Sequence, residues 1–167
     1  MKAQEILYQK SVEENFGIIS LTEFKDDIQM WSHYSNSHKG FCIGFKSEKL
    51  FFNQYDRFGI GGKVCYVKDM PIILPTEDPI EQFTKILYTK FEKWRYEQEY
   101  RLTKFNAADK VVHFHPDEVS EIIIGYSAND SDTQSIISIC KCNFPGTPVF
   151  KTKQKRLDFK LVFEQIL

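Results

Sequence analysis

The chain has 167 residues, of which 42% are apolar and 27% are charged, and its formal net charge is −1. This balance is typical of a globular protein with a sizeable core, and it excludes an intrinsically disordered chain. A net charge so close to zero argues against a broad nucleic-acid footprint, and no apolar stretch approaches the roughly 20 residues of a membrane span.

The cysteines point to a reducing compartment and to no metal site. Cys140 and Cys142 are separated by one residue, which is not a zinc-ribbon or thioredoxin spacing. Cys42 and Cys65 lie in apolar runs, where free cysteine usually behaves as a small buried hydrophobe. No segment of the signal-peptide type precedes them, so we expect a cytoplasmic protein without disulfides, structural zinc or a membrane partner.

Apolar periodicity predicts four elements in the first third of the chain. In chain order they are a helix over residues 2–15, a short buried strand over 18–21, a second helix that carries Ile28, Met30, Trp31 and Tyr34, and a continuous apolar strand over 41–45. Gly17 ends the first helix, Thr22 or Asp26 caps the second, and Gly40 closes it. The apolar run at 41–45 is polar on neither face, which favours a strand at the centre of a sheet.

The remaining two thirds alternate between short apolar runs and helical patterns. A short helix, a glycine-rich turn, a strand and a long helix that begins at Pro79 come first: residues 46–54, 59–62, 63–67 and 79–94. Strands, one helix capped by Asn129 or Asp130, and two terminal strands follow: residues 99–105, 111–115, 122–124, 130–139, 148–153 and 158–164. We therefore predict an α+β fold, with a mixed, mainly antiparallel sheet and flanking helices, in a single domain of residues 1–167.

A first motif joins a polar helical turn directly to a strand, from Trp31 to Phe45. Ser32, His33, Tyr34 and His38 could bind a polar ligand or transfer protons near neutral pH. The alternative is that the two histidines bond neighbouring backbone groups while the aromatic rings pack. For either histidine alone the second interpretation is favoured, because titratable groups point to function only statistically.

A second motif, from Trp94 to Arg101, follows the predicted long helix. If residues 97–101 are extended, Glu97, Glu99 and Arg101 share one face of the strand. Two carboxylates at that spacing need a nearby cation, and Arg101 is the obvious local partner. Such a glutamate can act as a general base or bind a sugar hydroxyl. The structural alternative is an ion pair of Glu99 with one of the neighbouring cations: Arg101, Lys93 or Arg95.

A pair of histidines forms a weaker pattern. His113 and His115 would share a face of the predicted strand 111–115, a pairing that can bind a metal. No third ligand is evident nearby in the sequence, so we predict no metal site.

Both motifs resemble the bacterial domain of unknown function 2971 family. The pattern Met-Trp-Ser-His-Tyr followed by His-Lys-Gly-Phe-Cys-Ile-Gly-Phe, and later Lys-Trp-x-Tyr-Glu-x-Glu-Tyr-Arg, looks like its core signature. The resemblance covers about residues 16–166. The family's N-terminal Tyr-Lys-Tyr-Arg and Asn-Asp-Pro-Phe elements have no counterpart in this sequence, so the chain resembles the C-terminal part of the family. The resemblance implies no established activity.

Besides a merely structural domain whose aromatic motifs hold the sheet together, two functions follow as hypotheses. The first is a ligand-binding or interaction module, in a bacterial stress or phage-defence system, whose partner is a small molecule or a protein, including a second copy of the chain. The alternative is an enzyme acting on a nucleotide or on NAD, because the His, Tyr and Glu residues loosely resemble those of ADP-ribosyltransferases. The candidate catalytic residues are Glu99, Glu97 and His33, and the candidate binding residues are Ser32, Tyr34, His38, Arg101 and Trp94. Both hypotheses assume that the two motifs converge on one pocket.

Overall fold

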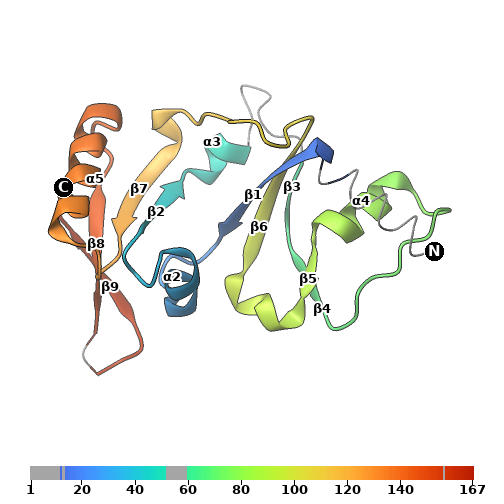
Figure 1. Cartoon of the computed structure of the whole chain (residues 1–167), viewed down its shortest axis with the longest axis horizontal. Helices are drawn as coiled ribbons and strands as arrows, with labels where there is room; N and C mark the ends of the chain where they lie inside the picture. Colours follow the sequence, from blue (N-terminus) through green and yellow to red (C-terminus); the bar gives the residue numbers. More distant parts are fainter. Residues whose placement is uncertain (1–11, 13, 52–59, 156) are drawn as a thin grey trace. The chain divides into compact units, whose positions relative to one another are not determined.

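The computed structural model describes residues 12, 14–51, 60–155 and 157–167 (Figure 1). The chain divides into two compact units, each built from two separate stretches of sequence. Unit 1 comprises Met1–Glu23 and Asn53–Val112, and unit 2 comprises Phe24–Phe52 and His113–Leu167. Among the described residues, no helix is both long enough and apolar enough to cross a bilayer. The single domain predicted from the sequence stays a prediction.

Unit 1 contains two small sheets. The first has the strand order β1-β6-β3 and is antiparallel throughout, and the second pairs β4 with β5 in parallel. The strands are β1 (Phe16–Thr22), β3 (Ile60–Lys63), β4 (Cys65–Val67), β5 (Thr89–Phe91) and β6 (Glu99–Phe105). Helix α4 (Pro79–Leu87) and the 3-10 helix η1 (Glu92–Glu97) complete the described part of this unit.

Helix α4 begins where the sequence predicts and ends seven residues early. The Asp78 carboxylate accepts a hydrogen bond from the Ile80 backbone N–H at 2.8 Å, and Pro79 occupies the first turn. Leu87 is the last helical residue, and Thr89–Phe91 leaves the helix to form β5. The prediction of one helix over 79–94 is therefore wrong beyond Leu87, because pairing with β4 replaces intrahelical hydrogen bonds there.

The core of unit 1 lies where α4 meets the start of β1. Leu87 and Tyr88 are buried with Val12, and the rings of Phe16 and Phe83 lie 4.5 Å apart at their centroids. Tyr88 also shares a buried hydrogen bond of 3.1 Å with Thr103 of β6. These contacts anchor the end of α4, and with it the start of β5.

Unit 2 is built around a four-stranded mixed sheet of order β2-β7-β8-β9. Strands β7 and β8 are parallel, while the two outer pairings are antiparallel. The strands are β2 (Phe41–Phe45), β7 (Val119–Ile124), β8 (Val149–Gln154) and β9 (Leu161–Gln165). The helices are α2 (Ile28–Tyr34), α3 (Ser47–Phe51), η2 (Pro116–Glu118) and α5 (Asp130–Asn143).

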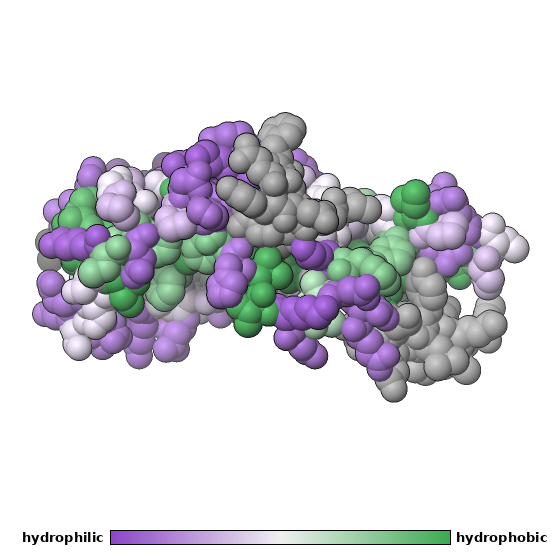
Figure 2. All heavy atoms as spheres, turned by 90° about the horizontal axis from the view of Figure 1, so that it is seen from above, coloured by the Kyte–Doolittle hydropathy of each residue, from purple (hydrophilic) through white to green (hydrophobic). Residues whose placement is uncertain are grey.

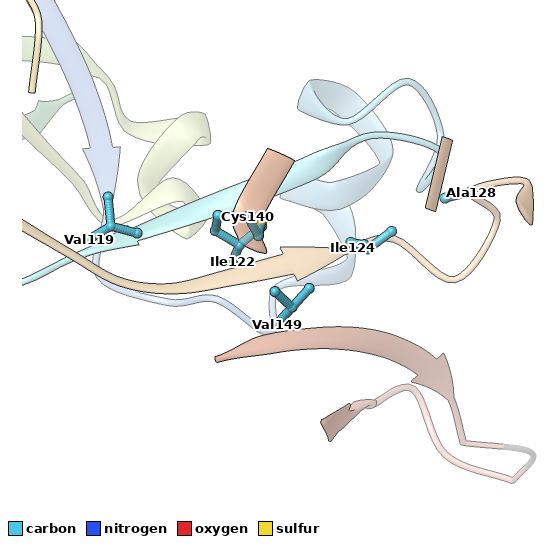
Figure 3. Packing of buried hydrophobic residues seen from close by; sticks show 6 residues of the cluster. All are labelled: Val119, Ile122, Ile124, Ala128, Cys140 and Val149. Carbon is cyan, nitrogen blue, oxygen red and sulfur yellow. The ribbon is translucent and has the colours of Figure 1, made fainter. Parts of the chain in front are cut away.

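The isoleucine run of β7 is buried on both faces of this sheet. Ile122 and Ile124 pack with Cys140 of α5 on one face, where Figure 3 shows their side chains together. Ile123 packs with Trp31 of α2 and with Leu161 on the opposite face. Because alternate side chains of a strand point to opposite faces, a strand covered by helices on both sides reads as a continuous apolar run.

The predicted fold class is confirmed, since helices accompany mixed and antiparallel sheets. The described strands form three sheets rather than one. Strand β2 pairs only with β7 among the described strands, so it lies at an edge and not at the centre. The apolar pattern of β2 wrongly predicted a central strand, since its side chains are only partly buried and Phe41 is exposed.

Several local predictions are wrong for identifiable reasons. Residues 111–115 form no strand, so His113 and His115 do not share a strand face; His115 precedes the 3-10 helix η2 instead. Gly61 and Gly62 lie inside β3 rather than in a turn, because they pair with Leu102 and Arg101 of β6. Glycine fits at position 61 since a Cβ there would come within 2.7 Å of the Leu102 side chain. Cys65 is exposed, not buried.

The helix boundaries near the N-terminus also differ from expectation. The N-cap of α2 is Asp27, whose carboxylate accepts from the Met30 backbone N–H at 2.9 Å, and neither Thr22 nor Asp26 caps it. Strand β1 begins at Phe16 and runs through Gly17. Most of the predicted helix 2–15, and residues 52–59 with Gly59, lie outside the described residues.

Candidate functional site

The acidic motif is positioned by a sharp change of backbone direction between η1 and β6. Gln98 adopts a left-handed conformation, with φ 44° and ψ 51°, and separates Glu97 on the 3-10 helix from Glu99 on the strand. The expectation that residues 97–101 form one extended segment is therefore wrong, because the strand begins only at Glu99. Both carboxylates nevertheless reach the same cation, because the turn directs them toward Lys90 of β5.

Four charged side chains form a connected network, called the ionic cluster below: Lys90, Glu97, Glu99 and Arg101. Arg101 holds Glu99 with two N–H groups, Nε at 2.7 Å from Oε1 and Nη2 at 3.1 Å from Oε2. The Lys90 ammonium donates to Glu99 Oε2 at 3.1 Å and also to Glu97 Oε2. Two cations therefore balance two carboxylates within hydrogen-bond distance.

The ionic cluster lies largely out of contact with water. The side chains of Glu97 and Glu99 are 2% and 6% exposed. Burial by itself would raise the pKa of Glu99, but hydrogen bonds from Arg101, Ser20 and Lys90 outweigh it and lower that pKa to about 2. Burial likewise disfavours the charged form of Lys90, yet its two carboxylate partners raise its pKa above the ordinary value. Both groups are therefore charged at neutral pH.

Backbone contacts tie the ionic cluster to the surrounding elements. The Thr22 hydroxyl donates to the Glu97 carbonyl at 2.8 Å, and the Tyr66 hydroxyl accepts from the Glu99 N–H at 2.8 Å. Arg101 also donates to the Leu87 carbonyl at the end of α4. The network thus joins β1, β4, α4 and β6, and its position is determined by the fold of unit 1.

The histidine motif of unit 2 contains an unusual backbone. Asn36, Ser37 and His38 have φ values of 50°, 55° and 63°, so three successive residues that are not glycine are left-handed. The turn is held by its own hydrogen bonds, among them Gly40 N–H to the Ser35 carbonyl at 2.7 Å. A backbone so rarely adopted persists only where the surrounding structure enforces it.

His38 is buried against the turn that follows β7. Its ring is 4.5 Å from that of Tyr126 and nearly parallel to that of Trp31 at 6.4 Å. Its carbonyl accepts from the Ser127 N–H at 3.0 Å, and Gly125 allows this approach because a Cβ there would lie 2.0 Å from the same oxygen. Burial lowers the pKa of His38, and its buried Nδ1 has no hydrogen-bond partner among the described residues.

The other predicted residues of this motif are at the surface. Ser32, His33 and Tyr34 are exposed on the last turn of α2, and Tyr34 keeps 65% of its surface in contact with solvent. Only His38 faces inward. The structure therefore does not gather Ser32, His33, Tyr34 and His38 into one enclosed pocket.

The two motifs belong to different units, since residues 31–45 lie in unit 2 and residues 94–101 lie in unit 1. Their convergence on a shared pocket stays a prediction. Within unit 1, Glu97, Glu99 and Arg101 are brought together as predicted, and the ion pair between Glu99 and Arg101 was among the predicted alternatives. The catalytic and binding roles of these residues also stay predictions.

Lys90 and Tyr66 are the main members of the site that the sequence did not reveal. Lys90 falls inside the segment predicted as a helix, where it looks like any other lysine on a solvated face. Tyr66 is 33 residues from the Glu99 that it contacts. The local sequence around Lys90 and Tyr66 does not indicate a role in the site, because the parallel pairing of β4 with β5 brings both residues to it.

A hollow of about 380 Å³ lies at the C-terminal end of α5 in unit 2. It is lined mainly by Cys140, Phe144 and the Pro145–Pro148 turn, and none of the predicted site residues lines it. Lys141 is the one charged residue in its lining. With so few polar groups it offers little chemistry, and the ionic cluster remains the better candidate site.

Residues 30–102 match the model of a family described as a protein of unknown function, DUF2971. The match contains both motifs and confirms the resemblance drawn from them, over a shorter range than the 16–166 expected. It is consistent with membership of that family. No curated protein and no solved structure is significantly similar to the chain.

Proposed function

We propose that this chain is a ligand-binding or interaction module, in which the ionic cluster is a structural brace and not a catalytic centre. The observation that carries this proposal is the charge balance of the cluster. Both oxygens of Glu99 already accept hydrogen bonds from Arg101, and one of them also accepts from Lys90. A carboxylate in this state has little capacity left to act on a substrate.

The low pKa of Glu99 also counts against general-base catalysis. An effective base has a pKa near the pH at which it operates, and the pKa of Glu99 is about 2. Its affinity for a proton at neutral pH is therefore far below what proton abstraction requires. Glu97 is 2% exposed, so a substrate could reach it only after the surrounding elements had moved.

An ADP-ribosyltransferase-like enzyme is the less supported alternative. In that chemistry a glutamate must contact the ribose while positive charge develops on it. Here Glu99 is already paired with the positive charges of Arg101 and Lys90. Its carboxylate therefore has no uncompensated negative charge with which to stabilise a positively charged ribose. The bacterial stress or phage-defence setting implied by the resemblance stays a prediction.

The test combines ligand screening with a direct assay for NAD consumption. Wild-type protein and the Glu99→Gln variant are incubated with NAD, and free nicotinamide is measured by proton NMR. In parallel, the melting temperature is recorded with NAD, other nucleotides and sugar phosphates. We expect at least one ligand to raise the melting temperature, with no nicotinamide released by either protein.

The matched control is Glu164→Gln, which removes the same charge from the exposed Lys153–Glu164 ion pair. Nicotinamide release by the wild type and by Glu164→Gln, but not by folded Glu99→Gln, would establish an enzyme and overturn the proposal. A chain that no ligand stabilises would equally contradict a ligand-binding module. Circular dichroism at the assay temperature verifies that each variant is folded.

A further inference from the structure

We propose that unit 2 binds a second copy of the chain through the open edge of β9, with the two β9 strands antiparallel about a twofold axis at Val162. The pairing would join the four-stranded sheet of one copy to that of the other, a common way for an open sheet edge to acquire a partner. It supplies a partner for the interaction module proposed above and therefore rests on that function.

Strand β9 is the last strand of its sheet and pairs only with β8 among the described strands (Figure 1). Successive residues of an edge strand turn their main-chain N–H and C=O groups alternately toward the neighbouring strand and away from it. At one end of β9 the Lys155 N–H donates to the Lys160 carbonyl at 3.1 Å, and at the other the Ile166 N–H donates to the Val149 carbonyl at 2.8 Å. The even-numbered residues from 160 to 166 therefore face β8, and the odd-numbered ones face away.

The main-chain groups of Leu161 and Phe163 are thus directed to the open edge of the sheet. No hydrogen bond from another described residue reaches them. The side chains of both residues pack in the core cluster around Trp31 and Ile123, so unit 2 itself holds the edge in place. A fixed row of main-chain donors and acceptors is what a further antiparallel strand requires.

Charge decides the register of the pairing. With the twofold axis at Val162, Leu161 faces the partner's Phe163, and the two residues can exchange N–H···O bonds. Lys160 then faces the partner's Glu164, and the symmetry repeats this pair of opposite charges. An axis at Phe163 would instead set Glu164 against the partner's Val162, and an axis at Glu164 would set two carboxylates against each other. The axis at Val162 is therefore the favoured one.

The side chains that would meet across the axis are accessible. The side chains of Lys160 and Glu164 are 73% and 54% exposed, and Val162 is 45% exposed. Alternate residues of a strand share a face, so these three side chains form one row. Within the chain, Lys160 lies 3.9 Å from Asp158 and Glu164 pairs with Lys153. Exposed pairs of this kind are weak, so each charge can still interact with a partner.

The charge pattern separates β9 from the other edge strands. Exposed apolar side chains occur in many places, as the face in Figure 2 shows, so exposure alone selects no edge. Even with the residue on each side included, none of the edge strands β1, β2 and β3 carries charges of both signs. None of them can therefore form reciprocal ion pairs with its own copy. Strand β9 also lacks the proline or bulge that commonly protects an edge, and its register with β8 is regular.

The test is sedimentation equilibrium of the full chain between about 10 µM and about 1 mM, where we expect a dimer with a dissociation constant of about 100 µM. One short strand buries little surface, so the protein should be monomeric at the low micromolar concentrations of a melting experiment. Lys160→Glu and Glu164→Lys each place like charges opposite one another twice. Each variant alone is expected to weaken self-association at least about fivefold.

The two variants are complementary, which provides a rescue experiment. In an equimolar mixture of Lys160→Glu with Glu164→Lys, every facing pair again has opposite charges, and so does the double variant. Both are expected to associate about as strongly as the wild type. The matched control is Lys63→Glu, which reverses the charge of an exposed lysine in unit 1 that pairs with Glu23. This control should self-associate like the wild type, and circular dichroism verifies that each variant is folded.

A wild-type protein that stays monomeric over this concentration range would overturn the β9 pairing. A dimer that neither single charge reversal weakens would do the same, as would association that neither the mixture nor the double variant recovers. Failure of the proposed function is a separate result of the nicotinamide assay. A monomer that is stabilised by a ligand and releases no nicotinamide keeps its role as a binding module, whereas release through Glu99 removes that role even from a dimer.

Discussion

The Glu99→Gln substitution tests the ionic cluster directly, because glutamine keeps the shape of the side chain and removes its charge. In the wild type, Glu99 makes charge-assisted hydrogen bonds to Arg101 and Lys90 while only 6% exposed. The variant leaves Arg101 without its carboxylate partner in a mostly buried setting. Removal of one member of a buried ion pair is typically costly, since the other charge stays desolvated.

The magnitude follows from the pKa of Glu99. Its ordinary value is 4.5 and its value in the folded protein is about 2. Each pKa unit corresponds to about 1.4 kcal/mol, so the ionised form of Glu99 stabilises the fold by about 3 kcal/mol at neutral pH. Because the folded-state pKa is depressed, this stabilisation is fully present above pH 4.5 and is lost as the pH falls toward 2.

The assay is urea denaturation followed by circular dichroism, at several pH values between 7 and 3. At pH 7 we expect Glu99→Gln to lower the free energy of unfolding by about 3 kcal/mol. The difference between wild type and variant should shrink steadily below pH 4.5, because Glu99 takes up a proton in the unfolded wild-type chain while it stays ionised in the folded protein. Glu164→Gln, in an exposed ion pair, should cost less than about 1 kcal/mol.

Two outcomes would refute this reasoning. A difference between wild type and Glu99→Gln that stays constant from pH 7 to pH 3 would mean that the charge of Glu99 is not its source. A cost at pH 7 no larger than that of Glu164→Gln would mean that the buried network contributes no more than a surface pair.

Three further predictions concern unit 2. Because the folded-state pKa of His38 is lowered from 6.5, the unfolded state takes up the proton first, so the free energy of unfolding should fall as the pH drops below 6.5; an identical pH slope in His38→Phe by urea denaturation would contradict this. Gly125→Ala should lower the free energy of unfolding by about 3 kcal/mol, since its Cβ would lie 2.0 Å from the His38 carbonyl oxygen. Gly146→Ala, at φ 83° in open space, should lower it by only about 1 kcal/mol. Thermal melting of the two variants measures the difference. Asp27→Ala should cost about 1 kcal/mol and Asp26→Ala almost nothing, because Asp27 is the N-cap of α2; equal melting temperatures would disprove that assignment.

The sequence by itself determined the class of fold and the motifs around which the candidate site is built. The continuous isoleucine run located β7 because this strand is buried on both faces, and Asn129 marked the start of α5 through its capping side chain. The two polar motifs were recognisable because their residue types are dense over a short stretch. Such features depend only on residues that are close together in the sequence, so the sequence alone reveals them.

Only the tertiary structure decided how the charges are paired and where the strands lie. The end of α4 at Leu87 depends on the pairing of β5 with β4, and that pairing brings Lys90 to both Glu97 and Glu99. Whether β2 lies at an edge depends on which strands find partners, which its own apolar residues do not encode. Glu99 looks like a candidate catalytic base in the sequence, but in the fold its charge is balanced both by its neighbour Arg101 and by Lys90, which only the pairing of β5 with β4 brings to it.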